Sequence, residues 1–301
     1  MLKVLGLSVF NVLLVILLSP LLEGIIRKTT ALVQSRIGPP LIQPYYDILK
    51  LLGKENLTSS DNFLFKYTPI FCFSIVLVMA LLTPFGIPAP LGMAGDTIVF
   101  IYLLTLSAVM VMMSGISSGS PYGAVGSARE VMMVLTVEPV IVIALITAGV
   151  KAGSLSFSDM VEWQVNHGLS FSMIITGIAL FLAIITQLAK LPFDIVEAET
   201  EIMGGPFIEQ SGPRLALFKW SIYVKELIFA SIFFSIFFPW PYFQNAPLNV
   251  IVNLVKIVVF IFIVGVVHSV NPRIRIDQSV KYFGAIIFIS FAGLAFALVG
   301  T

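Results

Sequence analysis

Long apolar runs separated by short polar segments alternate along the whole chain. Eight of these runs are close to the roughly 20 residues that a membrane-spanning helix requires. They are 4–22, 67–84, 98–115, 131–150, 171–189, 216–238, 248–267 and 282–299. Because backbone inside a lipid bilayer must satisfy its own hydrogen bonds, we predict that all eight are helices. Proline- and glycine-containing segments at 86–90, 119–121 and 239–241 end three of them.

The lysines and arginines between these runs predict how the chain is oriented. If the first polar loop faces the cytoplasm, thirteen of them lie in inside segments and only Lys3 and Lys151 lie outside. Such a bias is typical of cytoplasmic loops. We therefore expect a single membrane domain over 1–301 with eight spans and both termini outside. Its inside loops would be about 23–66, 116–130, 190–215 and 268–281.

Composition supports an all-α integral membrane protein. The chain has 301 residues, of which 58% are hydrophobic and 11% charged, with a net charge of +1. A soluble fold of this length could not bury so much apolar surface. The composition excludes a soluble enzyme, a nucleic-acid binder and a disordered protein. With one cysteine and two histidines, we expect this chain to hold no metal, haem or iron–sulfur cluster of its own.

The third inside loop is the most acidic part of the chain. Asp194, Glu197, Glu199, Glu201 and Glu209 fall within sixteen residues. Pro192 and Asp194 favour a helix start, and on such a helix Asp194, Glu197 and Glu201 would share a face from which Glu199 points away. Mutual repulsion should raise the pKa of some of these carboxylates. The alternative is a solvated acidic loop.

Two further inside segments carry polar patterns. In 43–55, the residues Tyr45, Ile48, Leu49 and Leu52 recur at helical spacing, which predicts a short amphipathic helix at the membrane interface. It is either a solvated connector or a docking surface. In 271–278, polar and apolar residues alternate, and the arginines there would either pair with the acidic loop or anchor a helix end. Candidate docking residues are Arg36, Gln43, Asp47, Lys50, Glu209, Arg273, Arg275 and Asp277.

Charged residues within the apolar runs are few and therefore informative. They are Glu138, which precedes Pro139, the adjacent Lys225 and Glu226, and Lys256, with Arg129 and Glu130 one to two turns before Glu138. Charges at membrane depth are costly and usually line a polar path or pair with one another. We expect Glu138 to be a protonatable relay. The alternative is a structural ion pair such as Arg129 with Glu130.

Four stretches together resemble one family, the H subunit of respiratory complex I and the equivalent subunit of energy-converting membrane-bound nickel–iron hydrogenases. The stretches occur in the family's order: 34–39 with 43–51, then 123–138, then 191–212, and finally 273–278. The first loop departs from the quinone-reducing type, since 38–40 passes almost directly to Gln43. Gly205-Pro206 and Gln210, at a position where tyrosine is usual, also differ. The chain is thus more similar to the hydrogenase-type subunit or to that of sulfur-reducing complexes.

The resemblance implies a non-catalytic subunit of an oxidoreductase complex in the cell (inner or cytoplasmic) membrane. It would dock a hydrogenase-like large subunit and a small iron–sulfur subunit and contact antiporter-like and other small membrane subunits. Iron–sulfur clusters, and in hydrogenases a nickel–iron centre, would belong to those partners.

In this interpretation, redox chemistry is coupled to proton or sodium translocation. The coupling residues would be Glu130, Glu138, Asp194, Glu197, Glu199, Glu201, Lys225 and Glu226. Three alternatives remain open: the quinone-site subunit of complex I proper, a free-standing secondary transporter, and a purely structural anchor. Inverted repeats would favour the transporter, and the sequence shows no obvious one.

Overall fold

The computed structural model describes residues 2–92, 95–243 and 245–300, with side chains from Val4 onward. The side chain of Lys3, one of the two predicted outside charges, thus lies outside the described residues. The described part forms helices joined by loops and contains no strand. The helices are α1 (Leu2–Val33), α2 (Gln43–Leu52), α3 (Phe63–Leu82), α4 (Asp96–Ser117), α5 (Pro121–Ala152), α6 (Phe157–His167), α7 (Phe171–Gln187), α8 (Glu199–Ile202), η1 (Gly205–Phe207), α9 (Gly212–Ile232), η2 (Phe233–Phe237), α10 (Ala246–Val270) and α11 (Ile276–Val299).

The predicted all-helical membrane fold is confirmed. Within the described residues, seven segments are long and apolar enough to cross a membrane. The remaining predicted span, 171–189, corresponds to α7, which is apolar but has only 17 residues. The described helices begin and end where the local sequence favours it. The Asn62 side chain accepts a hydrogen bond from the backbone N–H of Leu64 at the start of α3. Gly153, with φ of 67°, ends α5.

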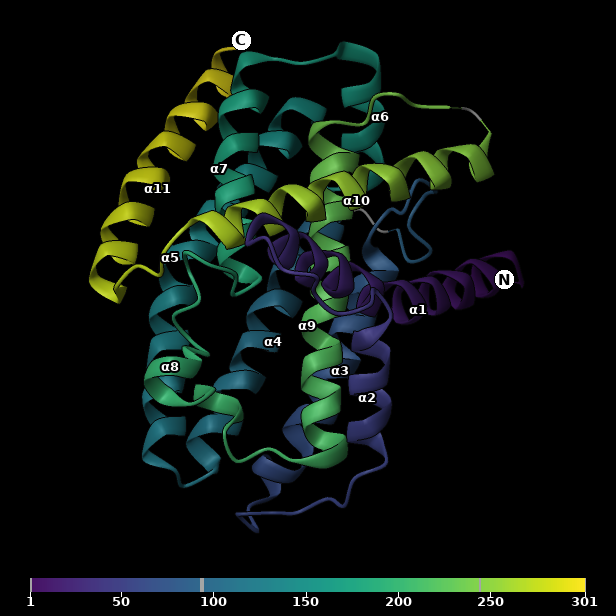
Figure 1. Ribbon diagram of the computed structural model, residues 1–301. Helices are drawn as coiled ribbons and strands as arrows, with labels where there is room; N and C mark the ends of the chain where they lie inside the picture. The colour runs from purple at the N-terminus through teal and green to yellow at the C-terminus, as the bar shows by residue number, and fades with distance from the viewer. Residues whose placement is uncertain (1, 93–94, 244, 301) are drawn as a thin grey trace.

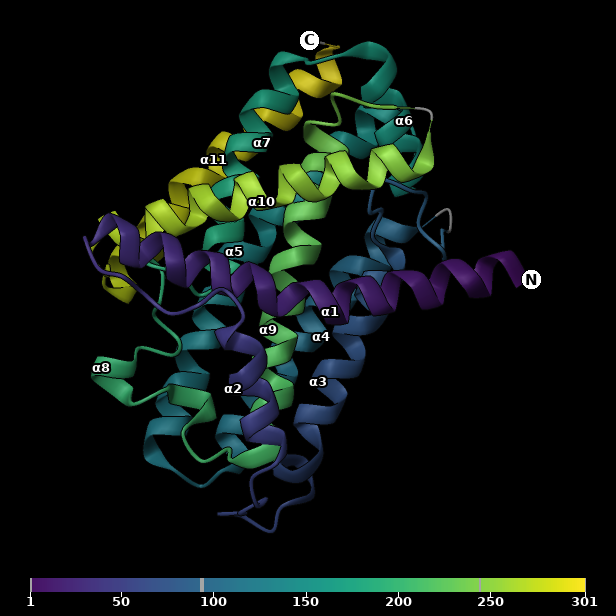
Figure 2. The ribbon, with the colours of Figure 1, turned by 45° about the vertical axis from the view of Figure 1, so that its right-hand side comes forward.

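Helix α9 lies in the interior of the bundle. In Figures 1 and 2, α1 and α10 run across α9, and α2 and α3 lie beside it. In the most apolar stretch of this span, 83% of the residues are buried inside the molecule, against at most 56% for the other candidate spans of the described chain. From Ser221 onward, polar side chains on α9 are therefore shielded from both lipid and water by other helices, which makes this part of the helix the natural place for a buried site.

Three elements differ from the sequence prediction. Helix α1 continues to Val33, so Glu23 and Arg27 lie within it and not in an inside loop. The segment 157–167, predicted as part of a loop, forms the amphipathic helix α6 and ends at His167. Helix α2 is present, but Leu49 and Leu52 of its predicted apolar face are exposed. These differences arise because packing against neighbouring helices extends or orients a helix in ways that periodicity does not specify.

The predicted helix through Asp194 and Glu197 is wrong. Residues 190–198 run as an irregular segment, and only Glu199–Ile202 form a helical turn. Phe193, Ile195 and Ala198 are buried in this segment, so successive side chains turn toward the core instead of following one helical face. Ala198 itself adopts a left-handed conformation with φ of 33°, which is incompatible with a continuing right-handed helix.

Candidate functional site

Two adjacent charged residues of α9 face two different groups of charges. Lys225 and Glu226 are both buried, with exposed fractions of 8% and 0%. Consecutive residues on a helix point about 100° apart. Glu226 lies against Lys190 from the segment after α7, whereas Lys225 interacts electrostatically with Glu130 and Glu138 of α5. Helix α9 therefore separates and connects two charged clusters.

The first group, which we call the Lys190 cluster, consists of Glu23, Arg27, Asp47, Lys190 and Glu226. The amine Nζ of Lys190 is 2.7 Å from Glu23 Oε2 and 2.9 Å from Glu226 Oε1. Arg27 donates to Glu23 Oε1 at 3.0 Å and to Asp47 Oδ2 at 2.7 Å. The cluster thus joins α1, α2, α9 and the start of the acidic loop through continuous charged contacts.

The Lys190 cluster carries an unbalanced charge. Its three carboxylates form ion pairs with two cations, so one negative charge is not balanced within the cluster when all five groups are ionised. The exposed Lys50 acts on Asp47 from outside the cluster. Burial disfavours the charged lysine, but the carboxylates of Glu226 and Glu23 outweigh it and raise the pKa of Lys190. Lys190 therefore stays positive. A single proton taken up by a carboxyl group would make the cluster neutral, which is favourable in a buried environment.

The second group, the Lys225 cluster, consists of Glu130, Glu138 and Lys225. Glu138 Oε2 accepts a hydrogen bond of 2.8 Å from Thr105 Oγ1 of α4, and its Oε1 has no hydrogen-bond partner. Pro139 follows Glu138 within α5 and removes a backbone donor from that helix. Two carboxylates again outnumber their cation. Like the first cluster, this one becomes neutral on taking up one proton.

The acidic loop, here residues 190–209, is held by arginines from two other elements. Arg273 binds Asp194 Oδ2 at 2.5 Å and approaches Glu201 Oε1 at 3.9 Å. Arg129 of α5 donates to Glu201 Oε2 at 2.8 Å and to the carbonyl oxygen of Ile195 at 3.2 Å. The sequence alternative that paired Arg129 with Glu130 is therefore wrong. Arg129 turns toward the loop, while its neighbour Glu130 interacts electrostatically with Lys225.

Two carboxyl groups of the acidic loop differ in their proton affinity. Burial, together with the charge of Asp194, raises the pKa of Glu197 to about 7. The hydrogen bond from Arg129 lowers the pKa of Glu201 below its ordinary value. Glu197 thus fits the expectation that some of these carboxylates have a raised pKa, whereas an arginine compensates the charge of Glu201. Glu199 is exposed.

Close backbone packing fixes the acidic loop against α5. A side chain carbon added at Gly126 would lie 2.6 Å from Pro206 Cδ and 2.7 Å from Gly205 Cα. One added at Gly205, which has φ of 52°, would lie 2.4 Å from the carbonyl oxygen of Val196. Glycine is therefore needed at both positions. A displacement of the loop at these residues would press directly on α5.

Most of the predicted docking residues lie apart from these clusters. Asp47 belongs to the Lys190 cluster, Arg273 binds the acidic loop, and Gln43 donates to Asp47 Oδ1 at 3.2 Å. Glu209 is partly buried, and the backbone N–H of Arg275 donates to the Gln278 side chain at the start of α11. The remaining three, Arg36, Lys50 and Asp277, are exposed.

Sequence reasoning missed Glu23, Arg27 and Lys190 as site residues. It placed Glu23 and Arg27 in a loop, although their spacing of four residues is the spacing of a helical ion pair. That spacing was an available signal. For Lys190 there was no such signal, since one carboxylate partner, Glu23, lies 167 positions earlier in the chain and the other, Glu226, lies on α9. The Nδ1 atom of His268 accepts a hydrogen bond from the backbone N–H of Leu191.

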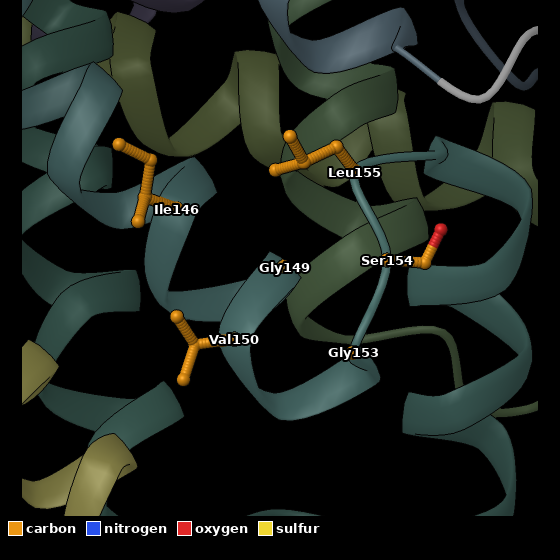
Figure 3. A pocket seen from close by; sticks show the side chains of 6 residues that line it. All are labelled: Ile146, Gly149, Val150, Gly153, Ser154 and Leu155. Atoms are coloured by element: carbon orange, nitrogen blue, oxygen red, sulfur yellow. The ribbon is translucent and has the colours of Figure 1, made fainter.

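Neither a metal site nor the cavity beside α5 competes with the charged clusters among the described residues. No group of three or more histidine, cysteine, aspartate or glutamate side chains among them is arranged to hold a metal ion. Figure 3 shows a cavity of about 440 Å³ where α5 ends, lined by Ile146, Gly149, Val150, Gly153, Ser154 and Leu155. Its lining contains no ionisable side chain. The charged clusters around α9 are therefore the candidate site.

Comparisons with known proteins agree on one family. The family described as NADH dehydrogenase matches residues 5–299. Formate hydrogenlyase subunit 4 of Escherichia coli is 32% identical over 93% of this chain and 92% of its own length. The H subunit of the NADH-quinone oxidoreductase of Rubrobacter xylanophilus is 28% identical over 84% and 81%. A chain of the membrane-bound sulfane sulfur reductase, an archaeal respiratory membrane complex, superimposes with a TM-score of 0.90 at 27% identity, covering 98% of this chain and 99% of its own.

Proposed function

Because this chain belongs to the NADH dehydrogenase family, whose members include membrane subunits of complex I-like and hydrogenase-like respiratory complexes, we propose that it couples redox chemistry to ion translocation. In this proposal it is a multi-pass subunit without a catalytic centre of its own. The residues of the acidic loop respond to events in a redox arm, and the two buried clusters relay that response across the bundle.

The proposed partners follow from the relatives. The face that carries the acidic loop, α2 and Arg36 would dock a hydrogenase-like large subunit and a small iron–sulfur subunit. Iron–sulfur clusters and a nickel–iron centre would lie in those subunits. Antiporter-like and other small membrane subunits would cover part of the lipid-facing surface. Identity of 32% to a formate hydrogenlyase subunit, against 28% to an NADH-quinone oxidoreductase subunit, favours the hydrogenase type.

The proposed relay uses two pairs of neighbouring residues as its steps. Arg129 holds Glu201 of the acidic loop, and the next residue, Glu130, belongs to the Lys225 cluster. Lys225 belongs to that cluster, and the next residue, Glu226, belongs to the Lys190 cluster. Movement of the loop would shift Arg129, alter the field at Glu130 and change which cluster holds the extra proton. Each step acts between neighbouring residues, so the proposed relay requires no large displacement of helices.

One observation carries this proposal. Lys225 and Glu226 are both buried in the most interior candidate span, and each belongs to a cluster with one uncompensated negative charge. A structural anchor has no need for such clusters, because two buried unbalanced sites reduce stability. A site that binds and releases a proton requires them.

The proposal is tested by Glu138→Gln in membrane vesicles that contain the whole complex. Loss of the titratable group should reduce ion translocation per turnover about tenfold or more, since one relay site disappears. Electron transfer to the acceptor and assembly of the complex should persist. Glu55→Gln, which changes an exposed carboxylate between α2 and α3, is the matched control and should translocate normally.

Two outcomes would contradict the proposal. Normal translocation by the Glu138→Gln complex would remove Glu138 from the path. Loss of assembly in Glu138→Gln together with Asp194→Asn would instead indicate that these carboxylates serve only to anchor the subunits. Assembly is measured by the subunit composition of the purified complex.

A further inference from the structure

A second cavity, whose lining includes polar and charged residues, lies at the end of the molecule remote from the acidic loop. It measures about 520 Å³ and lies between α6, η2, α10 and the segment after α3. In both ribbon views α6 and the start of α10 lie far from α8, which belongs to the acidic loop (Figures 1 and 2). None of the charged clusters described above contributes to its lining. The proposed coupling function therefore leaves this cavity unexplained.

Lys256 is the cation of this cavity, and its charge is not neutralised by a carboxylate. It is a partly buried residue of α10. Its amine donates to the carbonyl oxygens of Phe238 and Pro239 and, at 3.4 Å, of Pro241. Among the described residues, none of the ion pairs includes Lys256. The three N–H groups of the amine thus have three carbonyl partners, but the contacts with Phe238 and Pro241 are both 3.4 Å long and therefore weak, so the amine can redirect an N–H to an anion.

The lining is amphipathic in a way that matches a lipid headgroup. Around Lys256 lie Ser235 and the side-chain amides of Asn166, Asn249 and Asn253. Apolar side chains complete the wall: Ile87, Pro88, Val161, Val165, Phe234 and Tyr242. A small inorganic anion has no use for such a wall, whereas the glycerol backbone and first methylenes of a lipid would be buried against it.

Helix α10 continues this lining with a lipid-facing strip. Ile251, Val255, Val259 and Phe262 are each at least half exposed in the isolated chain. They follow one another at intervals of three or four residues, so they form one face of the helix. Val255 directly precedes Lys256. Lys256 therefore lies on the adjoining face of α10, and a lipid whose acyl chain lies on the strip can place its headgroup at the cavity.

The charge at the cavity mouth favours a phosphodiester over free phosphate. Glu162, an exposed carboxylate, lines the same cavity as Lys256. Close to neutral pH a phosphate monoester or free phosphate carries more than one negative charge, and Glu162 repels it more strongly than a singly charged diester. We propose that this cavity binds the phosphate of a membrane phospholipid, with Lys256 as its principal ligand and the strip on α10 as the seat of an acyl chain.

Native mass spectrometry of the intact complex tests this site. The complex is incubated in detergent with dioleoyl phosphatidylethanolamine, and bound lipid is counted. Lys256→Gln should lose one lipid per complex, or bind it about tenfold or more weakly, because a charge-assisted hydrogen bond disappears. Lys256→Arg should retain it. Lys151→Gln is the matched control, since it removes a lysine at the end of α5 that does not line the cavity.

A second variant keeps the test independent of the stability of Lys256 variants. Asn166→Trp places a large side chain at an exposed lining position, which should exclude the lipid while Lys256 stays in place. Inorganic phosphate at millimolar concentration should not displace the lipid. Undiminished lipid in both Lys256→Gln and Asn166→Trp would overturn the proposal. So would displacement by inorganic phosphate, which would indicate a site for small anions.

Discussion

The acidic loop and the two buried clusters around α9 handle negative charge in opposite ways. The loop contains more carboxylates, but Arg129 and Arg273 compensate Asp194 and Glu201 directly. The Lys190 and Lys225 clusters contain fewer carboxylates, yet each has one more carboxylate than cations and is shielded by helices. The loop thus derives a defined shape from its charges, whereas the clusters retain an unsatisfied demand for a proton.

Under the proposed function, this difference would separate sensing by the loop from transport by the clusters within one chain. A compensated surface segment responds to a partner by moving, because its ion pairs are partly exposed and individually weak. An uncompensated buried cluster responds by changing protonation, because movement there is restricted by packing. The density of carboxylates along a sequence is therefore a poor guide to where protons are held. Where protons are held depends on how the cations are arranged around the carboxylates.

Removing Lys190 should have the largest effect. It would show how strongly the Lys190 cluster depends on its buried cation. Lys190→Met leaves the buried Glu226 without a cation and Glu23 with Arg27 as its ion-pair partner, which should cost about 3–5 kcal/mol. We expect a marked fall in the melting temperature and yield of the purified complex. Lys219→Met, at an exposed position of α9, should change stability by about 0.5 kcal/mol or less. Equal stability of the two variants would contradict the proposed balance.

Gly126→Ala tests how firmly the loop is connected to the buried clusters. The added carbon would lie 2.6 Å from Pro206 Cδ, and relieving this overlap should cost about 1–3 kcal/mol. Hydrogen exchange of the backbone at 196–207 should become faster. Gly284→Ala in α11 has nothing within 4 Å of its added carbon and should leave that exchange unchanged. Identical protection in both variants would mean that the loop is not held by this contact.

Glu197 is the exception within the loop, and its removal should change only the pH dependence. Its pKa is raised from 4.5 to about 7, so the folded state holds the proton more tightly than the unfolded state. Stability supplied by this proton is lost as the pH rises from about 4.5 to about 7. Glu197→Gln should therefore gain in melting temperature relative to the wild type over that range, with a constant difference above it. If plots of melting temperature against pH for the two proteins ran parallel from pH 5 to 8, this assignment would be disproved.

Glu201→Gln should have the smallest effect. Its ion pair with Arg129 is half exposed, and such pairs are worth about 0.2–1 kcal/mol. The small loss of stability should shrink further at high salt, because mobile ions screen exposed charges. Asp194→Asn breaks a less exposed pair with Arg273 and should cost more. If Glu201→Gln proved the more damaging of the two, the loop would depend on Glu201 for more than its shape.

The sequence predicts the membrane architecture well and the site only in part. Apolar runs long enough to span a bilayer identify the helices because lipid imposes their length. Glu138, Lys225 and Glu226 stand out for a related reason, since charge inside such a run is expensive. The pairing of Lys190 with Glu23 is different. It depends on how α1 crosses α9, and that crossing is set by packing between distant segments.

The same limit explains the error in the acidic loop. Its spacing of carboxylates fits a helical face, but burial of Phe193 and Ile195 outweighs that local preference. Helix α6 was missed for the opposite reason. At 11 residues, with polar and apolar side chains interspersed, it has too short an apolar pattern to be recognised without the helices against which it packs.

The connection between α7 and the acidic loop has a consequence for how this chain can vary in length. Lys190 binds α1 and α9, the backbone of the next residue, Leu191, donates to His268 of α10, and Pro192 accepts a hydrogen bond from Ile274. Three consecutive residues are thus each assigned to a different neighbour. One inserted or deleted residue here would shift all of these contacts together. We expect natural insertions and deletions among related chains to avoid this connection and to accumulate in segments such as 53–62, where the backbone is largely exposed.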